Sequence, residues 1–399
     1  MITVTQAQAL IQQRITPLTA SESVPLAQAL GLVCARDVVS EMDIPPHANS
    51  AMDGFALRAA DLSTKSTFAI SQRVPAGVAP QALVAGTAAR IFTGGELPVG
   101  ADAVVIQENC AFDSQNVTVL QTVCEGENVR PQGQDIARGA VVVPRGKRLN
   151  AIDLSLLASV GRASIDVFCP LRVAILSTGD ELAEPGQPLK SGQIYNSNRV
   201  LLAALCRQMG YQVIETRCVA DTFAQTTSAL RDAAGSADVI LSTGGVSVGE
   251  EDHVRPAVEA TGELELWKVQ MKPGKPVAFG RVAETPFLGL PGNPVSAFVV
   301  FQLLATVLLR ARQGQTSTSL IAMKVVADFS RPVTTREDYL RVQLVSTENG
   351  QTVARPFANM SSGVMSSLAW ADGLVRQPID QAINVGDTVD FLPIREAML

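Results

Sequence analysis

Hydrophobic positions along the chain change their spacing several times, and each change predicts a different kind of element. Apolar residues recur at helical spacing over 2–14, 24–31 and 150–161, and the last stretch has Asn150 or Asp153 as a possible N-cap and Gly161 as a stop. From about 52 to 138, short Val, Ile and Ala runs alternate with Gly, Pro, Asn and Asp, which predicts a small β domain. An all-β block between helical segments indicates an insertion. We therefore expect a discontinuous N-terminal helical and mixed domain (1–51 with 139–170) around an inserted β domain (52–138).

Strand and helix patterns alternate from 171 to 315. The apolar run "LRVAILSTG" (171–179) has the length of a buried strand, a helix capped by Asn198 and stopped by Gly210 follows, and 222–245 repeats the order of helix then strand. Such alternation predicts a doubly wound α/β domain (171–315) whose parallel sheet is covered on both faces. The apolar run 295–309 is too short for a membrane span and predicts a buried helix. After 316 the strand pattern returns and predicts a compact C-terminal β barrel or sandwich (316–399).

Composition narrows the classes of function. The net charge of −6 argues against general nucleic-acid binding, because phosphate contacts need clustered Lys and Arg. Two histidines, His47 and His253, are too few for a histidine-based metal cage. The six cysteines are scattered without a C-x-x-C pair and are typical of reduced thiols, and the first residues show no signal-peptide pattern. We therefore expect a cytoplasmic protein that contacts neither nucleic acid nor membrane.

One short pattern occurs twice at the end of an apolar run. Ser177-Thr178-Gly179 closes the first run, and Ser242-Thr243-Gly244-Gly245 closes the second. Ligands of open parallel sheets bind at the carboxyl ends of the strands, where Gly allows close approach and Ser and Thr offer hydroxyl groups. Either copy alone is more often only the end of a strand. Two copies, each followed by carboxylates, favour two loops that converge on one ligand.

Charged residues follow the same strand ends. Asp180 and Glu181 come after the first copy, Glu250, Glu251 and Asp252 after the second, and Asp221 ends the intervening strand. Carboxylates so placed could hold Mg²⁺ against a substrate phosphate, although a single such acid is more commonly a solvated loop residue or a charge at a helix N-terminus.

Opposite charge comes from a lysine-rich turn. Lys268, Lys272 and Lys275 surround a Pro-Gly turn, either as an anion cradle or as surface lysines of a hairpin. In the next turn, Asn293 can cap a helix whose first position is Pro294, which leaves free N–H groups for an oxyanion. The chain contains no Walker A sequence, no dinucleotide fingerprint and no G-x-S-x-G elbow. These patterns together indicate a site for a phosphorylated small molecule, a divalent cation and a further oxyanion.

Several longer motifs resemble one family. "PPHANSAMDGFA" (45–56), "IFTGGELPVGADAVV" (91–105), "RPQGQDIARG" (130–139), "LSTGDEL" (176–182), "YNSNR" (195–199), "STGGVSVGEEDH" (242–253), "MKPGKP" (271–276) and "LPGNPVSA" (290–297) follow the order expected of the molybdopterin molybdenumtransferases, which are similar to the E domain of gephyrin. The last 80 residues match mainly in length and β texture. The chain departs from the usual pattern at His47-Ala48, Gln134 and Glu250-Glu251.

The resemblance implies a fold and a reaction. It implies a molybdopterin-binding α/β domain with an inserted β domain, an N-terminal mixed domain and a C-terminal β barrel. It also implies an elongated homodimer whose active site lies between one subunit's α/β domain and the partner's inserted domain. Adenylylated molybdopterin would bind there with molybdate and Mg²⁺, the adenylate would be hydrolysed with release of AMP, and molybdenum would be installed on the dithiolene sulfurs.

The resemblance also implies roles for individual residues. Asp53, Thr93 and Asp135 would be the partner subunit's contribution, and Glu181, Asp221 and Asp252 would place metal and water near the phosphoanhydride. The two Ser-Thr-Gly turns would hold the pterin and its phosphate. The remaining residues would receive molybdate and phosphate charge or shape their loop: Lys268, Lys272, Lys275, Ser296, Pro291 and Pro294.

Two rival functions and a set of partners complete the sequence-based picture. A molybdopterin adenylyltransferase would share the α/β domain, but it has no use for the N-terminal 170 residues or for the β tail. A non-catalytic molybdopterin-binding scaffold would need no metal site. Partner proteins would be the molybdopterin adenylyltransferase, which makes the substrate, and downstream cofactor-handling proteins.

Overall fold

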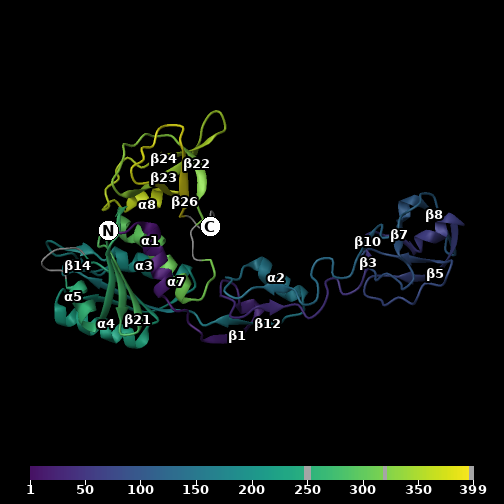
Figure 1. Cartoon of the computed structure of the whole chain (residues 1–399), viewed down its shortest axis with the longest axis horizontal. Helices are drawn as coiled ribbons and strands as arrows, with labels where there is room; N and C mark the ends of the chain where they lie inside the picture. Colours follow the sequence, from purple (N-terminus) through teal and green to yellow (C-terminus); the bar gives the residue numbers. More distant parts are fainter. Residues whose placement is uncertain (247–252, 318–320, 395–399) are drawn as a thin grey trace.

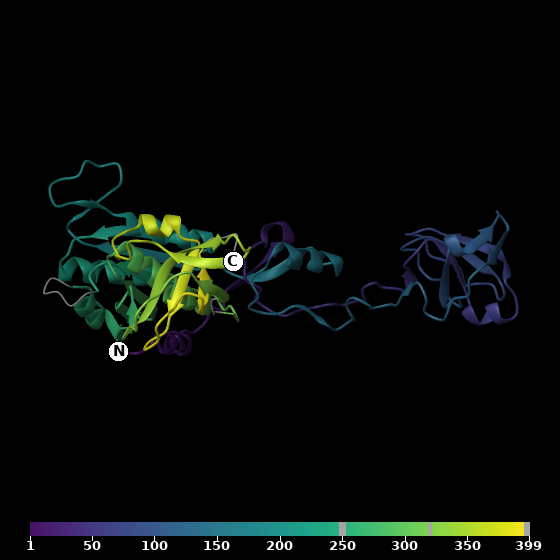
Figure 2. The ribbon, with the colours of Figure 1, turned by 90° about the horizontal axis from the view of Figure 1, so that it is seen from above.

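The chain forms an elongated molecule in a computed structural model that describes residues 1–246, 253–317 and 321–394 (Figure 1). One end carries a large α/β sheet with the C-terminal strands packed above it, and a separate β unit forms the opposite end. Viewed from above, two thin segments of chain run side by side to the distant β unit (Figure 2). The strand pair formed by residues 21–25 and 164–168 and helix α2 (Ala151–Ser159) lie between the two ends.

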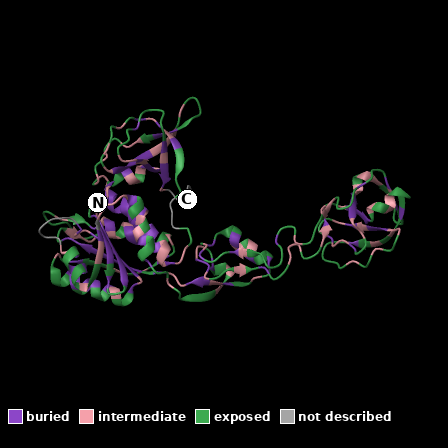
Figure 3. Cartoon of the chain, in the orientation of Figure 1, coloured by how far each residue is buried: buried purple, intermediate pink, exposed green. Residues whose placement is uncertain are grey.

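The α/β unit is built on a six-stranded mixed sheet. Four neighbouring strands are parallel and two at one edge are antiparallel. In spatial order the strands are β16 (Gln212–Val219), β13 (Arg172–Thr178), β17 (Val239–Thr243), β21 (Thr285–Leu290), β20 (Pro276–Val282) and β18 (Gly262–Lys268). The central strands are buried along nearly their whole length (Figure 3), as their continuous apolar sequence predicts.

Helices cover both faces of this sheet, which confirms the doubly wound α/β fold. One face packs on α1 (Val4–Arg14), α3 (Ser197–Gln208) and the long helix of residues 294–312. The other face packs on α4 (Phe223–Ser236) and α5 (Val254–Thr261). A short parallel pair, β14 (Leu182–Ala183) and β15 (Ile194–Tyr195), lies beside the sheet. The apolar layers on the two faces therefore hold the parallel strands in place, with their carboxyl ends together at one edge of the sheet.

The long helix of the α/β unit runs from α6 (Pro294–Val300) through a π-helical turn (Phe301–Ala305) to α7 (Thr306–Arg312). The helix extends beyond the apolar run 295–309, so by length and composition it could cross a membrane, contrary to the expectation from that run. However, 83% of its most apolar 18-residue window is buried inside the protein. It is the core helix predicted for this region. Pro294 occupies its first turn as expected, but among the described residues the Asn293 side chain makes no capping hydrogen bond.

The inserted unit is a six-stranded sheet, and short two-stranded pairs lead to it. Its spatial order is β7 (Ala103–Ile106), β4 (Gly54–Leu57), β6 (Ala88–Ile91), β5 (Thr67–Val74), β9 (Asn116–Val119) and β8 (Cys110–Phe112). The pairs are β1 (Ser21–Pro25) with β12 (Ser164–Phe168), β2 (Val38–Val39) with β11 (Val141–Val143), and β3 (Asn49–Ser50) with β10 (Val129–Arg130).

The C-terminal strands close into the predicted barrel. β23 (Glu337–Ser346), β24 (Thr352–Pro356), β22 (Met323–Ala327), β26 (Thr388–Pro393) and β25 (Gly373–Gln377) pair in that order, and β25 pairs back onto β23. The barrel also carries α8 (Ser366–Trp370). A short strand of the α/β unit, β19 (Met271–Lys272), pairs with β23 and connects the two units.

Two local predictions are wrong. The helix predicted over 24–31 is a strand end and a 3₁₀ turn (Leu26–Gln28), because Ser21–Pro25 pairs with β12 instead of coiling. Asn198 does not cap α3. The cap is Asn196, whose side chain accepts from the backbone N–H of Arg199, and this leaves Asn198 inside the first turn.

Candidate functional site

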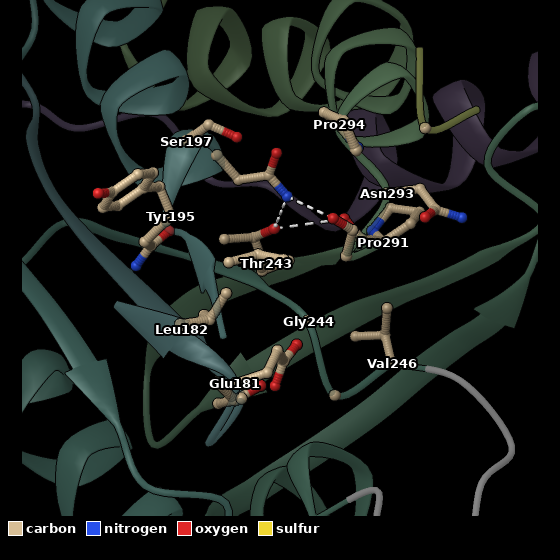
Figure 4. A pocket seen from close by; sticks show the side chains of 18 of the residues that line it. Glu181, Leu182, Tyr195, Ser197, Thr243, Gly244, Val246, Pro291, Asn293 and Pro294 are labelled. Carbon is tan, nitrogen blue, oxygen red and sulfur yellow. Dashed lines mark hydrogen bonds between the residues drawn. The ribbon is translucent and has the colours of Figure 1, made fainter. Parts of the chain in front are cut away.

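A cavity of about 700 Å³ opens at the carboxyl ends of the parallel strands (Figure 4). We call it the large cavity. Its wall comes from the ends of four sheet strands and from the first turn of two helices. It is lined mainly by Thr178, Gly179, Glu181, Leu182, Ile194, Tyr195, Asn196, Ser197, Asn198, Asp221, Thr243, Gly244, Gly245, Val246, Pro276, Pro291, Gly292, Asn293, Pro294, Gly363 and Met365.

Both Ser-Thr-Gly turns reach this cavity. β13 and β17 are neighbours, and Ser177 pairs with Thr243 in the register of the two strands. Thr178 and Thr243 line the cavity with the glycines that follow them, while Ser177 and Ser242 are buried in the strands behind. The two copies of the pattern therefore lie side by side at one cavity, and their role in ligand binding remains a prediction.

Gly244 is required by the close approach of the two turns. Its φ is +90°, and a Cβ atom there would lie 2.4 Å from the backbone oxygen of Thr178. Another residue would strain its own backbone and push the first turn away. A ligand in the cavity can therefore approach the bare backbone of the second turn.

An amide and a hydroxyl group tie α3 to both turns that follow the central strands. Asn198 donates through Nδ2 to Thr243 Oγ1 at 2.9 Å and to the Gly292 oxygen at 2.6 Å. Thr243 in turn donates to the Pro291 oxygen at 3.2 Å (Figure 4). This network fixes the cavity wall in one arrangement. Within the described residues, the buried hydroxyl of Thr178 and the Nδ2 atom of Asn196 have no hydrogen-bond partner, which suits a polar ligand.

Two of the three predicted metal carboxylates line the large cavity. Glu181 follows the first turn and Asp221 follows β16. The backbone N–H of Asp221 donates to Asp180 Oδ1 at 3.1 Å, so Asp180 orients the loop that carries Asp221. The third residue, Asp252, lies outside the described residues, and within them no group of three or more acidic, His or Cys side chains forms a metal site. Carboxylate oxygens facing a phosphate-sized space are the ligands that Mg²⁺ prefers, so the residues present fit this ion.

A second cavity of about 390 Å³ adjoins the large cavity. Pro276 lines both cavities, and the segment 361–365 passes from one wall to the other. We call this second space the basic cavity. Its lining residues include Lys272, Pro273, Gly274, Lys275, Pro276, Ser296, Arg336, Asp338, Arg341, Met360, Ser361 and Ser362.

The basic cavity contains three of the four residues predicted to receive oxyanion charge. Lys272, Lys275 and Ser296 line it, whereas Lys268 pairs with Pro276 across β18 and β20 and lines neither cavity. Arg341 adds a cation from the C-terminal barrel. Only 1% exposed, it donates to Ser367 Oγ at 2.9 Å and to two backbone oxygens at 3.1 Å each. Burial lowers the pKa of the Arg341 guanidinium, and the nearby Asp338 carboxylate opposes this effect.

Of the residues predicted to be the partner subunit's contribution, Asp53 and Thr93 contact each other. Asp53 Oδ1 accepts from the backbone N–H and from the hydroxyl of Thr93, both at 2.8 Å. These hydrogen bonds lower the pKa of the Asp53 carboxyl, with a smaller contribution from the Arg90 charge. Arg90 also donates to the Gly54 oxygen at 3.2 Å, next to Asp53. Asp135 is exposed in the connecting segment, where its N–H donates to Ile44. Within one chain the β unit that carries Asp53 and Thr93 lies at the opposite end of the molecule from the α/β sheet and its cavities (Figures 1 and 2).

Sequence reasoning missed several residues of both walls. Asn196, Asn198 and Tyr195 belong to the motif "YNSNR", so their position after a strand was a usable signal that we interpreted only as a helix start. Arg336, Asp338 and Arg341 gave no signal, because their contact with the lysine turn depends on the pairing of β19 with β23.

Three family models match successive parts of the chain. They are the MoeA N-terminal region (domain I and II) at residues 2–161, the probable molybdopterin binding domain at 174–311, and the MoeA C-terminal region (domain IV) at 326–394.

Curated relatives and solved structures agree with these matches. A molybdopterin molybdenumtransferase of Haemophilus influenzae is 38% identical over 79% of this chain and 78% of its own. One from Staphylococcus aureus is 30% identical over 93% and 90%. The crystal structure of the molybdopterin biosynthesis moeA protein from Pyrococcus horikoshii OT3 matches with a TM-score of 0.85 and 27% identity, covering 99% of this chain and 100% of that one.

The α/β unit with its strand-end cavity, the inserted β unit and the C-terminal barrel define a protein of molybdenum cofactor biosynthesis. The chain belongs to the molybdopterin molybdenumtransferase family, as its sequence motifs predict.

Proposed function

We propose that this protein inserts molybdenum, supplied as molybdate, into adenylylated molybdopterin, with hydrolysis of the adenylate and release of AMP. The observation that carries the proposal is the pair of adjoining cavities. A polar cavity at the strand ends suits the pterin and its phosphates, and a cation-rich cavity beside it suits a tetrahedral dianion. Family membership supports the same reaction.

The residues of the large cavity would bind and orient the substrate. Thr178 offers the pterin phosphate a buried hydroxyl that has no hydrogen-bond partner among the described residues. Thr243 holds the cavity wall behind it through Asn198 and Pro291, and the bare backbone at Gly244 lets the ligand come close. Glu181 and Asp221, together with Asp252 from outside the described residues, would hold Mg²⁺, which supplies charge neutralisation at the phosphoanhydride. Water would attack one phosphorus of the phosphoanhydride, the bridging P–O bond would break, and AMP would leave while the pterin keeps its own phosphate. The hydrophobic cores on the two faces of the sheet would hold the strand ends, and with them the carboxylates, in place during this step.

The residues of the basic cavity would bind molybdate next to the pterin sulfurs. Lys272, Lys275 and Arg341 neutralise the dianion, and the hydroxyl of Ser296 offers a hydrogen bond. Because Pro276 lines both cavities, molybdenum would travel only a short way from one site to the other. The sulfurs belong to the substrate, so no protein thiolate is needed.

The active site would be completed by a second copy of the chain. Asp53 and Thr93 belong to the inserted unit at the far end of the elongated molecule (Figure 1). They therefore cannot reach the large cavity of their own subunit. In a two-fold homodimer, the inserted unit of one subunit would cover the cavity of the other. We further propose a cytoplasmic enzyme that receives its substrate from a molybdopterin adenylyltransferase, passes its product to downstream cofactor-handling proteins, and contacts neither nucleic acid nor membrane.

Release of AMP from the purified protein tests the reaction. The full chain is incubated with adenylylated molybdopterin and Mg²⁺, with and without molybdate, and AMP and pterin-bound molybdenum are measured. Molybdate-dependent AMP release with metal-loaded pterin is the expected result. Binding without AMP release would instead support a scaffold, and pyrophosphate-driven formation of ATP would support an adenylyltransferase. A Glu181→Gln variant, which keeps the shape of the side chain, should bind the pterin but release AMP at least about 100-fold more slowly.

A further inference from the structure

One carboxylate faces the cations of the basic cavity. Asp338 lines that cavity together with Lys272, Lys275, Arg336 and Arg341, and its side chain is only 5% exposed. A buried negative charge beside an anion site opposes anion binding, so its presence requires an explanation.

Among the residues that the structure describes, Arg331 and Lys272 both pair with this carboxylate. Arg331 donates through Nη2 to Asp338 Oδ2 at 3.0 Å, and Lys272 Nζ lies 3.4 Å from the same oxygen. The backbone fixes the meeting of Lys272 and Asp338, because the two residues are register partners in the parallel pair of β19 and β23. The Lys272 side chain is 46% exposed and lines the cavity, whereas Arg331 is not part of the cavity wall. Lys272 can therefore turn between Asp338 and a bound anion, and Arg331 stays behind Asp338.

We propose that Asp338 is a positioning residue that sets the affinity of the basic cavity for its oxyanion by sharing Lys272 with it. The inference rests on the proposed binding of molybdate in this cavity. Charge interactions in a partly buried site are several times stronger than in water, so a carboxylate that retains part of Lys272 weakens the hold on the anion. Arg331 acts in the opposite direction, because it neutralises Asp338 and leaves Lys272 available. This balance lets the cavity collect a dianion and still release it to the pterin.

Two variants should change molybdate binding in opposite directions. Asp338→Asn keeps the shape of the side chain and an oxygen for Arg331, but removes the charge that competes for Lys272. We expect it to bind molybdate on the order of three- to tenfold more tightly than the wild type. Arg331→Gln leaves Asp338 with Lys272 as its main partner, and we expect binding on the order of three- to tenfold weaker. A merely structural disturbance would weaken binding in both.

The measurement is isothermal titration of the full-length protein with molybdate at fixed ionic strength, with circular dichroism to verify folding. Sulfate, a dianion of similar shape, serves as a second probe and should show the same direction of change in each variant. In a Lys272→Gln background, Asp338→Asn should lose most of its effect, because the two residues act as a pair. If Asp338→Asn does not fold, Arg331→Gln alone decides the question.

The outcomes separate the two proposals. Molybdate binding by the wild type, with unchanged or weaker binding by Asp338→Asn, would overturn this inference alone, as would unchanged or tighter binding by Arg331→Gln. A wild-type protein that binds no molybdate would overturn the proposed function of the cavity and this inference with it.

Discussion

Two buried threonines of the α/β unit differ in what their hydroxyl groups do. The hydroxyl of Thr243 accepts from Asn198 and donates to Pro291, whereas that of Thr227 in α4 has no hydrogen-bond partner within the described residues. Replacing Thr243 with Val leaves the Asn198 amide and the Pro291 carbonyl oxygen each without one hydrogen-bond partner. We expect Thr243→Val to lower the free energy of unfolding by about 1–3 kcal/mol. Urea unfolding followed by the helical circular dichroism signal measures this, because the helices are concentrated in the α/β unit.

Thr227→Val is the matched control. It makes the same change of side chain at a buried site and removes a hydroxyl that satisfies nothing among the described residues, so stability should stay within about 0.5 kcal/mol or rise. Equal losses in the two variants would contradict the role assigned to the Thr243 network.

The Asp53–Thr93 pair predicts a shift in pH dependence. Two hydrogen bonds from Thr93 lower the pKa of the Asp53 carboxyl, so the ionised form persists to lower pH than in an ordinary aspartate. The interaction is present above the ordinary pKa and is lost as pH falls through the lowered value. Thr93→Val removes the hydroxyl donor but keeps the backbone N–H. We therefore expect the Asp53 pKa to rise and the acid limb of activity to move to higher pH, while Thr93→Ser stays close to the wild type.

Carboxyl NMR titration of Asp53 measures this pKa directly. The same titration in the Thr93→Val protein distinguishes a change in pKa from a loss of activity by other means. An unchanged Asp53 pKa in Thr93→Val would show that the hydroxyl does not hold the carboxylate.

At the level of single residues, sequence patterns located the wall of the large cavity better than that of the basic cavity. The Ser-Thr-Gly turns, Glu181 and Asp221 follow strand ends, and a parallel sheet brings all such ends to one edge. Asp338 and Arg341 lie on a strand of another unit, and nothing local in the sequence indicates that it pairs with the lysine turn.

Among the elements, the segment 359–367 depends on one buried guanidinium. Arg341 donates to the backbone oxygens of Asn359 and Ser361 and to Ser367 Oγ. Lysine cannot make this planar set of bonds, so Arg341→Lys should lower the local opening free energy of the segment by about 2–4 kcal/mol. Native-state hydrogen exchange at the amides of Ser367 and Leu368, both hydrogen-bonded in the structure, measures the loss.

Arg355→Lys provides the comparison on the same barrel. Arg355 pairs with Asp328 at the surface, and exposed pairs contribute little, so the change should cost less than about 1 kcal/mol. Slow exchange of Ser367 that persists in Arg341→Lys would show that other contacts hold the segment.

Element types followed from the sequence where one periodic pattern extended over many residues. The buried strands of the sheet and the long helix after Asn293 are such cases. The wrong helix over 24–31 is short, and its apolar spacing fits a strand end and a 3₁₀ turn equally well. Pairing with β12, a partner about 140 residues later in the chain, decided the outcome, and no local pattern indicates such a partner.

At the scale of the whole molecule, three separate parts of the chain meet at Gln270, just before the turn that carries Lys272 and Lys275. The N–H of Gln270 donates to Ile2 at the N-terminus, and the N–H of Glu337 on the barrel donates to Gln270. Lys272 and Lys275 follow this junction directly. The position of these lysines therefore depends on the α/β unit, the barrel and the first residues of the chain together. The sequence predicts the turn itself from its local pattern, but not the residues around it, because they come from distant parts of the chain.

The shape of the molecule predicts how two defective chains restore activity. If each site combines one subunit's Glu181 with the partner subunit's Asp53, then Asp53→Ala and Glu181→Ala proteins are each inactive alone. A mixed dimer of the two contains one intact site and one site with both changes. Random reassociation of equal amounts makes half of the dimers mixed, so activity should return to about a quarter of the wild-type value.

The measurement is AMP release after the two proteins are dissociated together and allowed to reassociate. Mixing without dissociation is the control and should restore little. The double variant Asp53→Ala/Glu181→Ala, reassociated with an equal amount of wild type, should leave about a quarter of full wild-type activity, because mixed dimers of these two chains contain no intact site. Recovery that stays at the level of the separate variants would mean that Asp53 and Glu181 do not act across subunits, and the distant position of the inserted unit would then need a different explanation.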